Sequence, residues 1–232
     1  MRIDRQSAIA VQDMPARLAN SAPVGLSSET LVSEICQMKW EKLDHDQILD
    51  SAWIYYYFSI QFRENLEIAR KLFPNDSRLE ELDRGERDTD NLSPCPGVVA
   101  AGERVNHDEF MLRSLRLEQI DPSRRRRLQA IGEAYLKTTR SMDMMTRASS
   151  LSSYEAGGLE AVFNAILRAP VWDGPALAAY RHFLVGHIEL DSDPEHGHGS
   201  LCEHLKPGEK VPQLWDAFRM ALAEGVPALV SR

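Results

Sequence analysis

The sequence has little of what marks secreted or membrane-spanning proteins. Its three cysteines, Cys36, Cys95 and Cys202, lie far apart without a CxxC pair, so we expect free thiols in a reducing compartment. No apolar run approaches the ~18 residues of a membrane helix. Residues 1–25 contain no apolar core of signal-peptide length. We therefore expect a cytoplasmic protein that does not act at a membrane.

Positive charge is also scarce, because 27 Lys and Arg residues stand against 35 Asp and Glu residues, giving a net charge of −8. Nucleic acids and anionic membrane surfaces attract positive proteins. Neither is therefore expected as the main partner. The basic run Arg124–Arg127 is interpreted as a solvated helix face that pairs with surface acids.

Alternating strand patterns, internal repeats and long low-complexity segments are missing as well, and helical spacing dominates. We predict an all-α bundle of seven or eight helices, with an N-terminal arm at 1–27 and a single domain at 28–232. Asp46, Ser152 and Asp121, which Pro122 follows, are the expected N-caps of three of the helices. The expected ranges are 29–43, 47–73, a short acidic piece at 77–85, 98 or 103 to 117, 122–142, 153–168, 173–193 and 211–225.

Histidines and acids gather in one late stretch, GHIELDSDPEHGHGSL, at 186–201. His187 and Asp191 are four residues apart, so on a helix they share a face with Cβ atoms about 5–6 Å apart. That spacing lets an imidazole and a carboxylate bind one metal ion. Pro194 perturbs or ends the helix, and glycines beside His196 and His198 let a further ligand fold back. The alternative is a solvated, polar helix end.

A second pair with the same spacing, Glu103 and His107, falls on one predicted helix. Ligands in a helical bundle come from facing helices, so these two pairs form the core of a predicted metal site. An exposed polar helix start is the competing interpretation. The third carboxylate is left open among Glu155, Glu160, Glu64 and Glu67, and Glu155 also fits as the third residue of a capping box with Ser152.

Two or three histidines with two to four carboxylates suit iron or manganese better than structural zinc. Two ions that share carboxylates would use up such a set of ligands. We therefore predict iron, with manganese as the alternative, and two ions if the site is complete. No residue is assigned a catalytic role.

The string HIELDSDPEHG resembles the last ligand helix of the haem-oxygenase-like superfamily, and within it the non-haem di-iron oxidases. These proteins carry His-x3-Asp and a further histidine on that helix, Glu and His on an earlier helix and a Glu on a middle helix. The resemblance implies a haem-oxygenase-like bundle. It implies the following metal ligands: Glu103, His107, Glu155, His187, Asp191 and His196, with His198 or Asp193 as alternatives to His196 because Pro194 intervenes.

The resemblance also implies O2-dependent oxidation of a small organic substrate, such as an amino acid or a fatty acid. Two alternatives stay open. Some relatives act without metal, as thiamine-salvage hydrolases or a quinone-forming oxidase, and there the histidines and glutamates would do acid–base work. A non-enzymatic helical binding protein is the third reading. A homodimer formed through the long helix is compatible with each of them.

Overall fold

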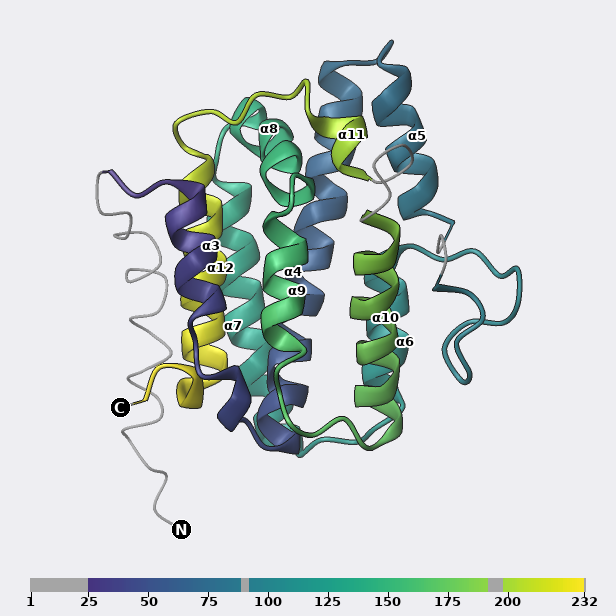
Figure 1. Cartoon of the computed structure of the whole chain (residues 1–232), viewed down its shortest axis with the longest axis vertical. Coiled ribbons are helices and arrows are strands. Elements are labelled where there is room, and N and C mark those ends of the chain that lie inside the picture. Colours follow the sequence, from purple (N-terminus) through teal and green to yellow (C-terminus); the bar gives the residue numbers. More distant parts are fainter. Residues whose placement is uncertain (1–24, 89–91, 192–197, 232) are drawn as a thin grey trace.

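A computed structural model describes residues 25–88, 92–191 and 198–231, without the Asp191 side chain. These residues form the predicted all-α bundle (Figure 1). Over these ranges there is no strand, only an isolated bridge between Cys95 and Val99. The α-helices are α3 (Ser28–Cys36), α4 (His45–Leu72), α5 (Ser77–Glu86), α6 (His107–Arg116), α7 (Pro122–Arg140), α8 (Met144–Glu155), α9 (Gly158–Ile166), α10 (Pro175–Asp191), α11 (His198–Cys202) and α12 (Val211–Gly225).

The long helix α4 is the centre of the bundle, and α5, α6, α7, α8, α10 and α12 all pack against it. Its N-cap is Asp44, whose side chain accepts from the Gln47 backbone N–H while Gln47 returns a contact to the Asp44 backbone. This complete capping box places the start of α4 before Asp46, which had been expected as the cap. At about 1.5 Å per residue, α4 runs through most of the height of the molecule (Figure 1).

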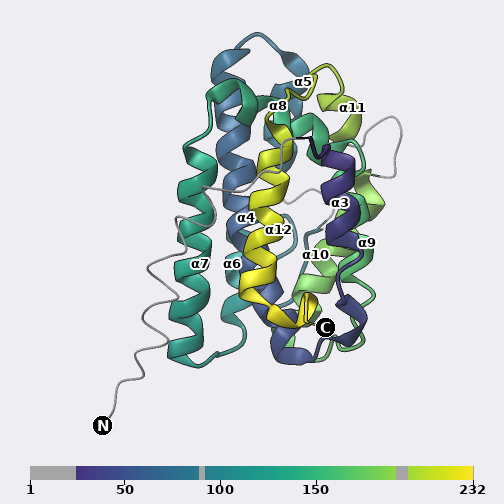
Figure 2. The same ribbon diagram turned by 90° about the vertical axis from the view of Figure 1, so that its left-hand side faces the viewer.

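Helices α3, α7 and α12 cover one side of α4, and α6 and α10 pair on the other (Figures 1 and 2). The short helices α5 and α11 pack together near one end of the bundle. Aromatic rings from several helices fill the interior, with Phe58 of α4 between Tyr154 and Phe218. No helix in the described ranges is both long enough and apolar enough to cross a membrane.

Two predicted helices begin elsewhere. The segment expected at 153–168 is two helices, because Asp143 caps α8 through the Thr146 N–H and Gly157 adopts φ 87° between α8 and α9. Only glycine takes that left-handed conformation at little cost. Ser152 therefore lies within the last turn of α8 and caps nothing. The described residues hold more helices than predicted because of this break and because α11 was not expected.

The second correction concerns the chain before α6. Gly97 and Gly102 both have positive φ, at 80° and 74°, and they keep the chain in turns. Helix α6 consequently begins at His107, with Asn106 as its N-cap residue. Glu103 directly follows the turn at 101–102, with its N–H bonded to the Ala100 carbonyl, and is not on the helix of His107. The proposed arm at 1–27 falls mostly outside the described residues, and α3 begins at Ser28.

Candidate metal centre

Five buried side chains meet where five helices converge, and four of them occupy helix ends. Glu86 is the last residue of α5 and Glu155 the last of α8, whereas His107 and His198 are the first residues of α6 and α11. His187 comes from the body of α10. Each of the five residues is less than one-tenth exposed. Buried ionisable groups are costly unless they are paired or bind metal, so this cluster is the strongest candidate for a functional site.

Glu86, His107 and His187 each bring one ligand atom to a common point, and these atoms lie within 4.8 Å of one another. His107 Nδ1 lies 2.7 Å from Glu86 Oε2 and 3.1 Å from His187 Nε2. Two imidazoles and one carboxylate are a donor set that could hold a metal ion. Without an ion, a proton on His107 Nδ1 can be shared between the other two atoms.

The backbone of α10 orients His187. Its Nδ1 lies 2.8 Å from the carbonyl oxygen of Phe183, one turn earlier. Because a carbonyl only accepts, this contact assigns the proton to Nδ1 and leaves the lone pair on Nε2. Nε2 is the atom that faces His107. A backbone partner of this kind fixes the tautomer and ring orientation of metal-binding histidines.

Glu86 faces a second pair of groups with its other oxygen. His198 Nδ1 lies 3.6 Å from Glu86 Oε1 and 3.6 Å from Glu155 Oε2. The two oxygens of Glu86 therefore point to two different groups of side chains. One of these groups is His107 with His187, and the other is His198 with Glu155.

Burial and the neighbouring imidazoles set the charges of the cluster. Burial raises the pKa of Glu86, but His107, His198 and His187 together lower it by more than burial raises it. The pKa of Glu86 therefore lies below its ordinary value. Burial raises the pKa of Glu155, which His198 only partly offsets. Burial and His107 lower the pKa of His187 to about 3. His187 is therefore neutral near pH 7, the form that binds metal.

A small cavity of about 20 Å³ adjoins the cluster. Its other walls come from α4, α9 and α10 and are mostly aromatic or aliphatic side chains. That volume holds one small molecule, because a water needs about 10–15 Å³ by this measure. The residues that line the cavity beside the cluster are Tyr55, Ser59, Phe62, Leu159 and Phe183.

The predicted ligands divide into three groups. The structure brings His107, Glu155 and His187 together, along with His198, which had been the alternative to His196. His196 and the Asp191 side chain lie outside the described residues. Glu103 is elsewhere: Arg113 donates to it at 2.6 Å, and it accepts from the Ala100 N–H at 2.9 Å. Its proposed pairing with His107 fails because the two do not share a helix.

The other candidate carboxylates are not part of the cluster either. Glu64 binds Arg140 and Arg147, and Glu67 binds Arg63. Glu160 is half-buried on α9 and does not line the cavity.

Glu86 is the ligand candidate that the sequence analysis missed. It had been placed just beyond a short acidic segment that was given no role. Its position still carried a signal, because Leu79, Leu82 and Glu86 are spaced as the buried face of a helix and all three are buried. A carboxylate in an apolar helical stripe requires a partner inside the protein.

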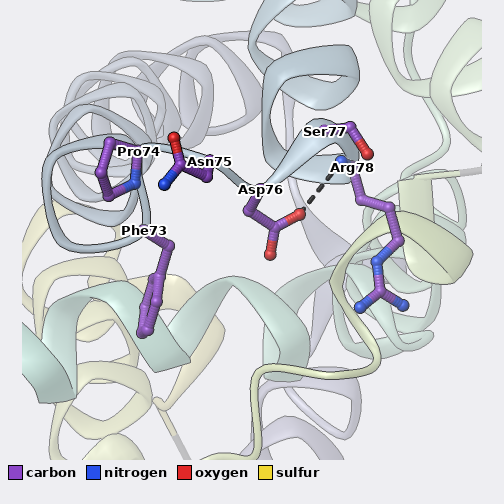
Figure 3. A pocket seen from close by; sticks show the side chains of 6 residues that line it. All are labelled: Phe73, Pro74, Asn75, Asp76, Ser77 and Arg78. Carbon is purple, nitrogen blue, oxygen red and sulfur yellow. Dashed lines mark hydrogen bonds between the residues drawn. The ribbon is translucent and has the colours of Figure 1, made fainter.

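A larger surface groove, of about 500 Å³, lies at the turn between α4 and α5 (Figure 3). It is lined by Phe73 to Arg78, and its carboxylate is already occupied. Asp76 Oδ1 accepts from the N–H groups of Arg78 and Leu79 as the cap of α5, and Oδ2 lies 2.5 Å from His204 Nε2. Both oxygens of the carboxylate in this groove are therefore already paired, and we do not assign a reaction to it.

Comparison of the chain with protein-family models, with curated proteins and with solved structures finds no significant match. The geometry of the buried cluster is accordingly the basis for the functional argument.

Proposed function

We propose that this chain is a non-haem iron enzyme with a haem-oxygenase-like bundle, which oxidises a small organic substrate with O2 in the cytoplasm. The observation that carries the proposal is the convergence of three imidazoles and two carboxylates in a buried cluster. This donor set is hard to intermediate in softness and has no thiolate, which fits iron or manganese. When bound, iron would supply the redox chemistry with oxygen.

The protein side of this chemistry is orientation and exclusion of water. The Phe183 carbonyl fixes the His187 ring, and Glu86 presents one oxygen to each half of the cluster. Tyr55, Phe62 and Phe183 shield one side from solvent. Such a dry wall strengthens electrostatic interactions within the site and suppresses side reactions. The adjoining cavity is of a size for a diatomic molecule or a single water.

Asp191 completes the proposed ligand set, because it follows His187 by one helical turn on α10. With it, the side chains that would hold the metal are Glu86, His107, Glu155, His187, Asp191 and His198. Amino acids and fatty acids remain the proposed substrates. The predicted dimer through the long helix is not carried into the proposal, because six other helices pack against α4.

The proposal is tested by loading the metal-free full-length chain with Fe(II) under anaerobic conditions and measuring bound iron by elemental analysis. We expect about two iron ions per chain for a two-metal site. His187→Ala and Glu86→Gln should each lower the iron content. The matched controls are His182→Ala and Glu103→Gln. His182 is on the same helix as His187, but its ring contacts the Leu92 carbonyl, and the Glu103 carboxylate binds Arg113. Both controls should bind iron as the unmodified chain does.

Oxygen uptake with amino and fatty acids then tests the reaction. If the chain takes up no iron and His187→Ala changes nothing, the proposal is wrong.

One observation favours a second candidate, a metal-independent enzyme of the thiamine-salvage or quinone-forming type. The 2.7 Å contact between Glu86 and His107 is an acid–base pair in which a proton can move. In that case the substrate would contact this pair directly. Activity that persists after exhaustive chelation would support it over the iron enzyme.

A further inference from the structure

Helix α11 supplies His198 to the cluster, although it has only five residues, His198–Cys202. Helices shorter than about 12 residues are marginal on their own. The position of His198 must therefore come from the contacts that α11 makes with its neighbours. It packs against α5, α8 and α10, and a glycine makes one of these contacts.

Gly199, the second residue of α11, lies against the backbone of α8. A Cβ atom at this position would be 2.9 Å from the carbonyl oxygen of Glu155 and 3.6 Å from its carbonyl carbon. The first distance is shorter than the approach that Cβ atoms adopt in proteins. The obstacle is main chain, so no side-chain rotation can relieve the clash. Only a residue without a Cβ atom lets α11 approach the end of α8 this closely.

The Glu155 carbonyl is itself held in place. It accepts a hydrogen bond from the Gly157 N–H at 2.8 Å, in the turn where Gly157 has a φ of 87°. Glu155 ends α8, which packs on α4, and α9 begins at Gly158. A side chain at position 199 would therefore displace the short helix α11 and not the turn between α8 and α9.

The backbone contact and the cluster contact involve the same residue of α8. The Glu155 carbonyl touches Gly199, while the Glu155 side chain faces His198, with Oε2 3.6 Å from His198 Nδ1. His198 directly precedes Gly199 in the chain. Any displacement of Gly199 therefore also moves the His198 ring away from its place beside Glu155 and beside Glu86 Oε1, which is 3.6 Å from Nδ1.

Further contacts hold the other end of α11. Cys202 is fully buried, and His204 Nε2 lies 2.5 Å from Asp76 Oδ2. Asp76 is the N-cap of α5, and Glu86 is the last residue of that helix. Helix α11 is thus held between α5 and α8, the two helices whose last residues are the carboxylates of the cluster.

We propose that Gly199 is a positioning residue of the buried cluster. Because it has no side chain, α11 rests on the Glu155 carbonyl, and this contact sets the place of His198 in the cluster. The inference deepens the proposed function and rests on it wherever an effect on metal binding is expected. The contact itself involves no metal, so it can be measured in the metal-free chain.

The contact is tested by amide hydrogen exchange of the metal-free full-length chain. For Gly199→Ala we expect exchange across residues 198–205 to accelerate by about tenfold, because an added methyl group overpacks the contact and α11 opens more often. Exchange in α4 should stay unchanged. The matched control is Gly208→Ala, which should change neither. Gly208 is exposed, and a Cβ atom there would meet only Ser149 Oγ, at an ordinary 3.9 Å.

The effect on the cluster is measured with Co(II), whose visible absorption reports its ligands. We expect Gly199→Ala to raise the Kd for Co(II) by about tenfold, as the loss of a group that orients a ligand does. The spectrum should change in the same way as in His198→Ala. In the His198→Ala background, Gly199→Ala should have no further effect on the Kd, because both changes act through one ring. A merely structural glycine would alter stability and leave the spectrum unchanged.

Unchanged exchange across residues 198–205 in Gly199→Ala would overturn the inference and leave the metal centre intact. Faster exchange in α4 as well would also overturn it, since the whole bundle would then need the glycine. So would an unchanged Kd and spectrum, or a further loss of affinity in the double variant, because Gly199 would then not act through His198. If the unmodified chain binds no Co(II), the proposed function is wrong, whereas the exchange of Gly199→Ala still supports or overturns the contact.

Discussion

The bundle pairs its buried and half-buried carboxylates in two different ways. Asp50 on α4 is bound by Arg124 and Arg127, and Glu64, a few turns further along, is bound by Arg140 and Arg147. Glu86 and Glu155, by contrast, are surrounded by histidines, and within the described residues no Arg or Lys pairs with them. Arginine is always charged, whereas imidazole can be neutral and bind metal.

The difference separates carboxylates that hold the fold from carboxylates that are available for chemistry. The arginine pairs join α4 to α7 and α8 and are complete without any ligand. The basic run Arg124–Arg127, expected to be a solvated face that pairs with surface acids, is exposed from Arg125 to Arg127, and Arg124 and Arg127 pair with Asp46 and Asp50 of α4. The histidine cluster also joins five helices. The negative charges of its carboxylates are fully balanced only when a metal ion is bound or when the neighbouring groups take up protons. Four predictions test this contrast.

The largest expected effect is that of Arg147→Met. The buried Arg147 donates to Asn65 at 2.8 Å and to Glu64 at 3.0 Å. Its loss leaves the buried side-chain oxygen Oδ1 of Asn65 without this hydrogen bond and removes one cation from Glu64. The free energy of unfolding should therefore fall by about 3–4 kcal/mol. Denaturant unfolding measures this. Arg140→Met, at the exposed end of the same Glu64, is the control and should cost clearly less.

Equal losses in Arg147→Met and Arg140→Met would show that burial does not distinguish the two arginines. A loss that depends on added metal would show that the arginine network and the histidine cluster are coupled.

The second prediction concerns metal. Iron at about 100 times its Kd should stabilise the unmodified chain by about 2.7 kcal/mol, because it binds only the folded state. This corresponds to a rise in Tm of roughly 5–10 °C for a chain of this size. Glu86→Gln should abolish the rise. Glu64→Gln is the matched control, and it should lower the starting Tm but keep the rise, since its carboxylate faces arginines. The same rise in Glu86→Gln would contradict the assignment of Glu86.

The parts of the fold that local chemistry determines could be predicted from the sequence. Asp121 and Pro122 were expected to begin a helix, and α7 begins at Pro122 with Asp121 accepting from two backbone N–H groups. The last helix was expected at 211–225, which are the bounds of α12. Both cases rest on caps and breakers within a few residues of the helix end. Predictions failed at Ser152 and at 98–106, where glycine conformation decided the boundaries.

The candidate site was harder to predict, because it is assembled from helix ends that are far apart in sequence. The residues His107, Glu155 and His187 could be named from their chemistry. The assumption that ligands pair at i, i+4 on one helix failed for Glu103, whose partner is Arg113. Glu86 was missed because only the tertiary structure brings α5 close to α6 and α11. Only its position in the apolar stripe of α5 pointed inward.

The third prediction uses pH on the metal-free chain. The pKa of His187 is lowered by burial from 6.5 to about 3 in the folded chain. Between pH 6.5 and pH 3 the unfolded chain binds a proton that the folded chain does not, so stability falls as pH falls. The slope is at most about 1.4 kcal/mol per pH unit. His187→Leu should remove it, whereas His182→Leu should not; urea unfolding at several pH values gives the slopes.

The arginine-bound carboxylates respond in a separate window. Despite burial, Arg140 and Arg147 hold the pKa of Glu64 below its ordinary value of 4.5. Its contribution is therefore present above pH 4.5 and is lost as pH falls through the lowered pKa. A slope between pH 6.5 and pH 4.5 that survives in His187→Leu would assign the pH dependence to other groups and weaken the contrast.

The smallest expected effect is that of Arg127→Gln, which tests how much the arginine pairing depends on burial. Arg127 is 42% exposed and contacts Asp50 Oδ2 at 3.0 Å, while Arg124 keeps its 2.6 Å contact with Oδ1. Asp50 thus retains one cation, and the loss of unfolding free energy should stay below about 1 kcal/mol. It should shrink further in high salt, because exposed charges are screened. Arg126→Gln, an exposed neighbour on α7, should cause no measurable change. A loss comparable to that of Arg147→Met would mean that Asp50 needs both arginines, so that the exposed pair is as structural as the buried one.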